Sequence, residues 1–256
     1  MPEATRRDGP EHHQHEHRRH RHHGHEHDRG IGAAGRYLRW LPQMWRSVIN
    51  DAVIEMVDLR PGERGVDIGA GMGAGVIPAA ETGAHVIAVE PTPFIRRVLR
   101  LRRMTSRRRT NIEVAGGAAE RIPADDRTID AIWAVNAMHH WVEVELAAAE
   151  IARVLRPYGR VLLVDEDFTD PSHPDHRRFG GDHDDERHGF TVVDTEMIGE
   201  LLRGVGLTDV DTSKRQIAGR PVVSVAAQGV TADPGRFRAE HSSPKHHNQK
   251  DGNPDD

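Results

Sequence analysis

The chain contains 256 residues, enough for one large domain or two small ones. It carries 35 Lys and Arg against 40 Asp and Glu, and a formal net charge of -5 gives no global case for nucleic-acid binding. Cysteine is absent, which excludes disulfides, thiolate nucleophiles and cysteine-ligated zinc. Hydrophobic residues make up only 36% of the chain. We therefore expect part of the length to stay outside a folded core.

Both ends of the sequence differ in composition from its middle. Residues 1–30 are rich in histidine, arginine and glutamate, and residues 231–256 in proline, histidine, lysine and aspartate. Such segments cannot offset their ordering entropy by burial, so we predict two disordered tails around one folded domain at 31–230. The sequence has neither the ~18 consecutive apolar residues of a membrane span nor the apolar run of a secretory signal. We expect a cytoplasmic protein with no membrane segment.

Hydrophobic periodicity and turn residues divide the middle of the chain into alternating elements. Helices are predicted at about 42–57, 74–82, 94–104, 143–155 and 194–204. A first strand is predicted to begin at Gly65 and to end in the glycines that follow. Further strands are predicted at 85–90, 111–115, 129–135 and 161–165. This alternation predicts an α/β fold with a parallel sheet covered on both faces. Two closing strands, 208–217 and 221–228, are joined by a tight turn and must be antiparallel. The face of the first helix expected to be buried comprises Trp45, Val48, Ile49, Ala52, Val53 and Met56.

Glycines alternate where the first strand ends, in the segment "VDIGAGMGAG" at 66–75. They let the backbone turn sharply and let a ligand approach the start of a helix without Cβ obstruction. The next strand ends at Glu90, where a carboxylate could accept hydrogen bonds from both hydroxyls of a ribose. Together these features predict a site for an adenosine-type cofactor.

The glycines alone do not identify that cofactor. Gly69, Gly71 and Ala74 also satisfy the dinucleotide pattern, so an NAD-dependent oxidoreductase is one alternative. Asp67 argues against it, because a carboxylate two residues before the first glycine would repel a pyrophosphate. The same carboxylate would favour a cationic ligand, such as a sulfonium with its amino group.

Four segments, in order along the chain, carry a resemblance to a known family. They are "LRPGERGVDIGAGMGAG" at 59–75, "VIAVE" at 86–90, "GGAAERIPADDRTIDAIWAVNAMHHW" at 116–141 and "ARVLRPYGRVLLVDE" at 152–166. They resemble the class I S-adenosylmethionine-dependent methyltransferases, in the small-molecule, ubiquinone/menaquinone-type branch (methyltransferase type 11). The resemblance implies a Rossmann-like seven-stranded sandwich with an antiparallel last strand. It also implies methyl transfer from S-adenosylmethionine to a small-molecule acceptor.

The resemblance also implies roles for individual residues. Asp67 and the glycine backbone would surround the methionine part of the cofactor, Glu90 would bind the ribose, and residues 118–120 would border the adenine. The implied cofactor-binding residues are Asp67, Gly69, Ala70, Gly71, Gly73, Glu90, Pro91, Ala118, Ala119, Glu120 and Asn136. Many relatives have aspartate at the position of Ala118, which cannot bind the adenine amino group. Because of this departure, an alternative function is that of a non-catalytic relative, which binds metal or a partner through its histidine-rich tails.

Polar residues follow the fourth strand at the edge where ligands bind in parallel sheets. His139 and His140 are the candidate catalytic bases, because imidazole can take a proton from an oxygen or nitrogen acceptor. The alternative is that either histidine only caps a helix or packs beneath the cofactor. Asn136 could bind the acceptor or simply end the strand, and Trp141 could line the adenine pocket or pack in the core. The acids at 165–167 end the fifth strand on the same edge, where one could touch the substrate, but we expect them to be solvated.

Histidine-rich segments raise the question of metal binding. The polar insertion at 168–190 is expected to act as a lid over the acceptor site. Its candidate ligands, His173, His176, Asp182, His183, Asp184, Asp185 and His188, match no named metal site, so we predict none. In the N-terminal tail, the alternating histidines are His13, His15, His17, His23, His25 and His27. They could chelate Zn²⁺ or Ni²⁺ adventitiously.

Arginines are dense between residues 96 and 109, around the predicted second helix of the alternating sheet. They could contact phosphates or an acidic partner, which would fit methylation of a nucleic acid. No aromatic residues interleave with them for base stacking, so we favour a solvated helix face and do not expect a nucleic-acid partner.

Overall fold

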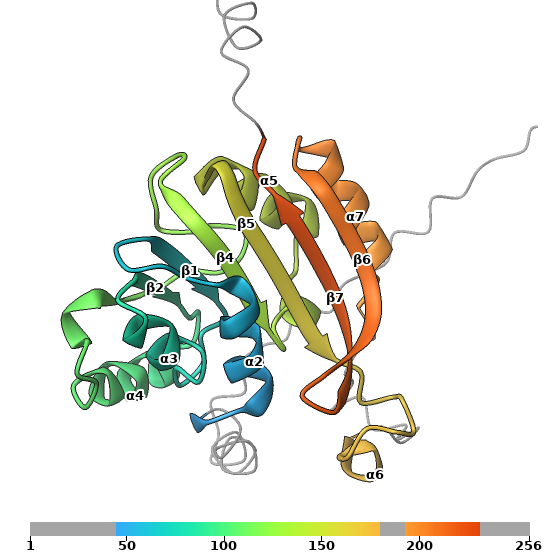
Figure 1. The fold of residues 1–256 in the computed structure, drawn as a ribbon, viewed down its shortest axis with the longest axis horizontal. Helices are drawn as coiled ribbons and strands as arrows, with labels where there is room; N and C mark the ends of the chain where they lie inside the picture. The colour runs from blue at the N-terminus through green and yellow to red at the C-terminus, as the bar shows by residue number, and fades with distance from the viewer. Residues whose placement is uncertain (1–44, 180–192, 231–256) are drawn as a thin grey trace, which may run out of the picture.

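The structure is a computed structural model that describes residues 45–179 and 193–230 (Figure 1). Within these ranges the strands form one seven-stranded sheet in the order β3-β2-β1-β4-β5-β7-β6. The strands are β1 Arg64–Ile68, β2 His85–Val89, β3 Ile112–Ala115, β4 Ile129–Val135, β5 Leu155–Glu166, β6 Thr208–Ile217 and β7 Arg220–Gln228. Strands β1 to β5 pair in parallel, and β7 runs antiparallel to both β5 and β6. The predicted fold class is confirmed.

Helices pack on both faces of the sheet, although one face of β5, β7 and β6 beside α2 is left partly uncovered. They are α2 Val48–Val57, α3 Val76–Glu81, α4 Pro93–Arg103, α5 Val144–Val154, the short α6 His176–Phe179 and α7 Thr195–Gly204. Figure 1 shows α2, α3 and α4 on one face, with α5 and α7 on the other. Each face has its own apolar core: Val53 of α2 and Trp133 of β4 belong to one cluster, and Ile151 of α5 and Leu202 of α7 to the other. The inner strands are buried on both sides where helices cover both faces.

Helix α2 begins later than predicted, and its buried face includes the predicted Ile49 and Val53 but is rotated away from the other predicted positions. It starts at Val48 after Ser47, and the predicted residues 42–44 lie outside the described part of the chain. Its buried residues are Ile49, Val53, Ile54 and Val57, whereas Val48 and Met56 are exposed. The sheet packs against positions four residues apart, namely Ile49, Val53 and Val57. The buried stripe is therefore rotated relative to the predicted one. Trp45 precedes the regular helix, and its ring lies 4.6 Å from the Arg102 guanidinium.

Strand β5 is longer than the predicted 161–165. It begins at Leu155, which pairs with Ile129, and the register shifts before Arg160 pairs with Ala131. Tyr158 adopts a left-handed φ of 60° within this irregularity. The "RPYGR" segment that we predicted as a connection is therefore an irregular part of the strand itself, comparable to a β-bulge.

The described residues include no helix with the length and apolarity to cross a bilayer. The predicted tails at 1–30 and 231–256 lie outside the described residues, as do residues 180–192, which include the end of the insertion. The cytoplasmic location stays a prediction.

Candidate functional site

The carboxyl ends of β1, β2, β4 and β5 meet at one edge of the sheet. Ile68 pairs with Val89 across β1 and β2, and Val135 pairs with Val164 across β4 and β5. The loops that follow these strands therefore lie side by side, as the predicted site requires.

The glycine loop after β1 is held in a conformation that glycine alone adopts readily. Gly69, Gly71 and Gly73 have φ values of 73°, 53° and 87°. The backbone N–H groups of Gly69 and Ala70 both donate to the Val89 carbonyl, at 2.9 and 3.0 Å. A Cβ on Gly69 would lie 2.7 Å from the Ala137 Cβ. The loop is therefore fixed against β2 and against the residues after β4.

The Glu90 carboxylate connects the glycine loop with the loop after β2. Its Oε2 accepts a hydrogen bond from the Gly71 N–H at 3.0 Å, and its Oε1 accepts one from the Thr92 N–H at 2.8 Å. Arg96 donates to the carbonyls of Glu90 and Pro91. Only 6% of Glu90 is exposed, and burial raises the pKa of its carboxyl. Each carboxylate oxygen has a second lone pair with which to accept from a ligand hydroxyl.

The Asp67 carboxyl lies beneath the same loop and is 3% exposed. Burial raises its pKa to about 8, the Trp133 indole N–H opposes this in part, and the nearby Glu90 charge adds to the rise. A buried carboxyl with a raised pKa is the group whose charge a cationic ligand would stabilise most.

Replacing Gly75 by alanine is expected to destabilise the protein by about 1–3 kcal/mol. A Cβ at Gly75 would lie 2.9 Å from both Asn50 Oδ1 and Asp67 Oδ2, and 3.2 Å from Trp133 Nε1. Urea unfolding measures the change. Gly204→Ala is the matched control, because nothing lies within 4 Å of its Cβ position. Equal effects of the two substitutions would contradict the crowding at Gly75.

The segment predicted to border an adenine follows β3. Ala119 is buried and Ala118 is partly buried, bridging to Arg121 in an isolated antiparallel pair. The Glu120 carboxylate accepts from the N–H groups of Val142 and Glu143 at the start of α5, at 2.9 and 3.2 Å. Its side chain therefore caps the helix N-terminus, and contact of residues 118–120 with a cofactor stays a prediction.

Asn136 follows β4 with a left-handed φ of 53°. Its Nδ2 donates to Glu166 Oε2, and its Oδ1 accepts from the Glu166 N–H, both at 2.7 Å. These reciprocal bonds join the ends of β4 and β5. The structure therefore favours the interpretation that Asn136 ends the strand, and contact with a ligand stays a prediction.

Asp165 and Glu166 are not solvated as predicted, and the Glu166 side chain is 7% exposed. We expected a solvated carboxylate, yet Asp165 is 3% exposed. Its Oδ1 accepts from the Ala137 and Met138 N–H groups at 3.0 and 3.3 Å. Its Oδ2 accepts from the His139 N–H at 3.2 Å and lies 2.7 Å from His139 Nδ1. The signal in the sequence was an acid that ends a buried strand next to β4.

The two candidate bases are therefore not equivalent. The His139 side chain is 8% exposed and held by Asp165, whereas His140 is exposed. The two rings are in contact, with centroids 4.0 Å apart. A carboxylate at Nδ1 favours the tautomer with its proton on Nδ1, which directs the basic lone pair to Nε2. Trp141 is partly buried and packs against the α5 side of the core.

The first part of the 168–190 insertion packs against the sheet edge. His173 is buried, its Nδ1 accepts from the Asp175 N–H at 3.0 Å, and its Nε2 lies 3.1 Å from Glu166 Oε1. Arg220 Nη1 also donates to Glu166 Oε1, at 2.8 Å. No cluster of candidate metal ligands occurs among the described residues. The further candidates Asp182, His183, Asp184, Asp185 and His188, together with the tail histidines, lie outside them, and a lid role stays a prediction.

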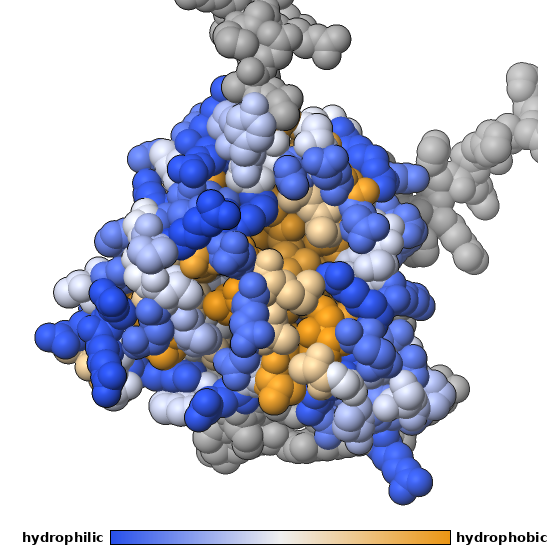
Figure 2. Space-filling view, in the orientation of Figure 1, coloured by the Kyte–Doolittle hydropathy of each residue, from blue (hydrophilic) through white to orange (hydrophobic). Residues whose placement is uncertain are grey.

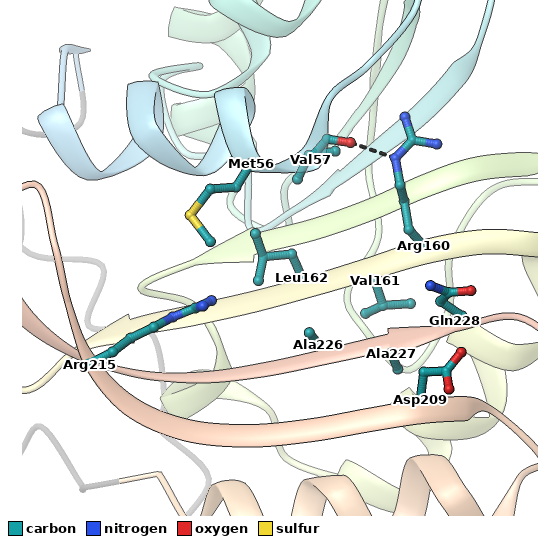
Figure 3. A pocket seen from close by; sticks show the side chains of 10 residues that line it. All are labelled: Met56, Val57, Arg160, Val161, Leu162, Asp209, Arg215, Ala226, Ala227 and Gln228. Carbon is teal, nitrogen blue, oxygen red and sulfur yellow. Dashed lines mark hydrogen bonds between the residues drawn. The ribbon is translucent and has the colours of Figure 1, made fainter.

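A cavity of about 260 Å³ lies elsewhere, between α2 and the exposed face of β5, β7 and β6. Figure 3 shows Arg215 at one end, Arg160 and Gln228 at the other, and apolar side chains such as Leu162 between them. In Figure 2 the corresponding strip beside α2 is the most hydrophobic part of the visible surface. The cavity lies apart from the glycine loop, so it is not the predicted cofactor site.

A seven-stranded sheet with this order and a glycine loop after β1 define a Rossmann-like methyltransferase fold. Residues 66–163 match the family model described as "Methyltransferase domain". An uncharacterized methyltransferase of Mycobacterium tuberculosis (strain H37Rv) is 41% identical over 101 residues, covering 40% of this chain and 39% of that protein. A demethylmenaquinone methyltransferase of Renibacterium salmoninarum is 31% identical over 128 residues, covering 50% and 49%. The matches thus span at most about half of these relatives.

Solved structures show the same fold. A methyltransferase of Aquifex aeolicus superposes with a TM-score of 0.55 at 18% identity, covering 73% of this chain and 92% of that one. Haemonchus contortus phosphoethanolamine N-methyltransferase 2 gives 0.56 at 16% identity, covering 71% and 52%. The [4+2]-cyclase SpnF gives 0.58 at 15% identity, covering 78% and 96%, so the fold alone does not fix the reaction. The matched segment is therefore similar to methyltransferase domains, including those of relatives named as demethylmenaquinone methyltransferases.

Proposed function

We propose that the protein transfers a methyl group from S-adenosylmethionine to a small-molecule acceptor. The observation that carries the proposal is the buried Glu90 carboxylate, fixed between two loops at the carboxyl edge of the sheet. The family match and the relatives named as methyltransferases support it. When bound, the cofactor supplies an electrophilic methyl group on a cationic sulfur.

The residues on this edge fit such a cofactor. Glu90 would accept from the ribose hydroxyls, with Pro91 beside it. Asp67 and the loop at 69–73 would hold the methionine end, where the buried carboxyl complements a positive charge. The positive φ values in this loop favour glycine, and glycine places no side chain against the ligand.

The acceptor side is formed by the loops after β4 and β5. In our proposal the His139 Nε2 takes a proton from the attacking oxygen, nitrogen or carbon acid, while Asp165 holds the ring in place. Displacement at the methyl group needs acceptor, methyl and sulfur in line and water kept away. A base held by a buried carboxylate would help to orient the acceptor for this alignment, because the imidazole ring cannot rotate without losing its bond to Asp165.

Replacing Glu90 by glutamine should weaken binding of S-adenosylhomocysteine at least about tenfold, since two charge-assisted hydrogen bonds to a ribose would be lost. Calorimetric titration of the full chain measures the affinity, with NAD as a second ligand. Glu113→Gln, at an exposed acid on β3, is the matched control. Tight binding of NAD in place of the sulfur ligand would overturn the proposal in favour of an oxidoreductase.

A second candidate is a non-catalytic relative, which the alanine at position 118 favours. In that case a folded protein would bind neither S-adenosylmethionine nor S-adenosylhomocysteine. The same titration therefore decides between the two functions.

A further inference from the structure

The exposed face of α4 combines large apolar side chains with arginines. Phe94, Leu101 and Met104 are 59%, 72% and 59% exposed. Arg97 is also exposed, and its spacing places it in the same stripe, three residues after Phe94 and four before Leu101. Leu101 has the largest exposed fraction among the large hydrophobic residues that the structure describes. Three large apolar side chains at helical spacing place this hydrophobic surface on one side of the helix.

Other residues of α4 attach the helix to the rest of the domain. Ile95 and Leu99 pack inward, and Arg102 is buried with its Nη1 donating to the Met72 carbonyl at 2.8 Å. Arg96 and Arg103 donate to backbone carbonyls of neighbouring segments. The helix is therefore anchored by one face, and the stripe of Phe94, Arg97, Leu101 and Met104 contributes nothing to that anchoring.

The charge around this stripe is strongly positive. Between Pro93 and Ile112 the sequence has eight arginines and no acidic residue. The exposed arginines are Arg97, Arg100, Arg107, Arg108 and Arg109, and none forms an ion pair with a described residue. Glu81, from the adjoining α3, accepts a hydrogen bond from Ser106 at 3.2 Å and leaves these cations uncompensated. The patch therefore carries a local positive field on a chain whose net charge is -5.

We propose that the α4 face, defined by Phe94, Arg97, Leu101, Met104 and Arg107–Arg109, binds an anionic lipid surface. The arginines complement lipid phosphates, and the apolar side chains enter the boundary between headgroups and acyl chains. Figure 1 shows α4 at an outer edge of the molecule, and Figure 2 shows strongly hydrophilic side chains protruding there. The helix can therefore lie flat on a surface without obstruction from the rest of the described domain.

The apolar residues distinguish a lipid from a nucleic acid. A nucleic acid would use the arginines on phosphates and an aromatic ring on a base, but it offers no hydrocarbon to Leu101 or Met104. A lipid surface uses both kinds of side chain at once. The proposal is independent of methyl transfer, since none of the stripe residues belongs to the proposed catalytic or cofactor site.

Flotation of the full chain with vesicles tests this surface. Vesicles of phosphatidylcholine with 30 mol% phosphatidylglycerol are compared with pure phosphatidylcholine, at pH 8 so that the tail histidines are neutral. We expect binding to the anionic vesicles alone. Arg107→Gln combined with Arg108→Gln should reduce it about fivefold per arginine. Leu101→Ser should reduce it about tenfold, since one buried aliphatic side chain is lost from the interface.

Matched controls use exposed residues outside the α4 face. Leu146→Ser on α5 and Arg121→Gln after β3 make the same types of substitution elsewhere on the surface. Neither should alter vesicle binding by more than about twofold, because these residues lie outside the α4 face. Absence of binding to anionic vesicles would overturn the proposal. So would binding that Leu101→Ser leaves unchanged, or binding to a single-stranded RNA oligonucleotide that responds to the arginine variant but not to Leu101→Ser. Circular dichroism of each variant confirms that the fold is retained.

Discussion

Asp67→Asn is expected to stabilise the ligand-free protein by an amount that grows between about pH 4 and pH 8, and to weaken its binding of S-adenosylmethionine. Burial raises the pKa of the Asp67 carboxyl from 3.8 to about 8. The folded protein therefore holds a proton that the unfolded chain has released between about pH 4 and pH 8. This contribution to stability is fully present below pH 4 and is lost as the pH rises through 8. Asparagine does not titrate, so the variant should gain up to about 5 kcal/mol relative to the wild type at pH 9.

Urea unfolding at pH 5, 7 and 9 measures this difference, which should grow with pH. Asp51→Asn, at an exposed position on α2, is the control and should change stability little at any of these pH values. In titrations, the wild type should bind S-adenosylmethionine more tightly as the pH rises toward 8, because the ionised carboxylate attracts the sulfonium. The affinity of the protein for S-adenosylhomocysteine should depend less on pH, because the sulfur of this ligand carries no charge. A destabilised Asp67→Asn at pH 9 would contradict the assigned environment.

Asp165→Asn is expected to lower kcat by about 10² to 10⁴, the range for loss of general-base catalysis. The amide oxygen can still accept from the Ala137 and Met138 N–H groups, but the amide NH₂ would then face His139 Nδ1. The ring would change to the tautomer with its proton on Nε2, which can no longer take a proton from the acceptor. The KM for the cofactor should change little, because Asp165 does not contact the glycine loop.

Two readouts separate this role from a purely structural one. ¹⁵N NMR of the histidine rings should show the His139 proton on Nδ1 in the wild type and on Nε2 in the variant. Asp167→Asn is the matched control, since this neighbouring acid accepts from Thr169 and does not contact His139. Full activity in Asp165→Asn, with the changed tautomer present, would exclude His139 as the base. His140→Ala should then be assayed next.

Local patterns were sufficient to predict most of the sheet and its glycine loop. β4 and β6 have the predicted bounds, and the loop after β1 lies against Glu90 as its spacing indicated. The errors occur where a distant segment decides the outcome. The buried face of α2 depends on which strands lie beneath it, and the irregular start of β5 depends on its pairing with Ile129.

The same limit applies to the site. Asp165 and Glu120 are hydrogen-bonded to backbone N–H groups 22 to 28 residues away in sequence, at the ends of neighbouring elements. No periodicity or composition indicates such a bond, because it forms only after elements distant in sequence have packed together. The resemblance to a family identified the positions of these residues but not their partners.

The position of β7 has a consequence for synthesis on the ribosome. This last strand lies between β5 and β6, so β6 pairs with β7 alone within the described sheet. Until residues 220–228 have left the exit tunnel, β5 presents an unpaired edge and β6 has no neighbour. Nascent chains that end before β7 therefore expose strand edges that can pair with other chains. Completion of the domain awaits the emergence of its final strand.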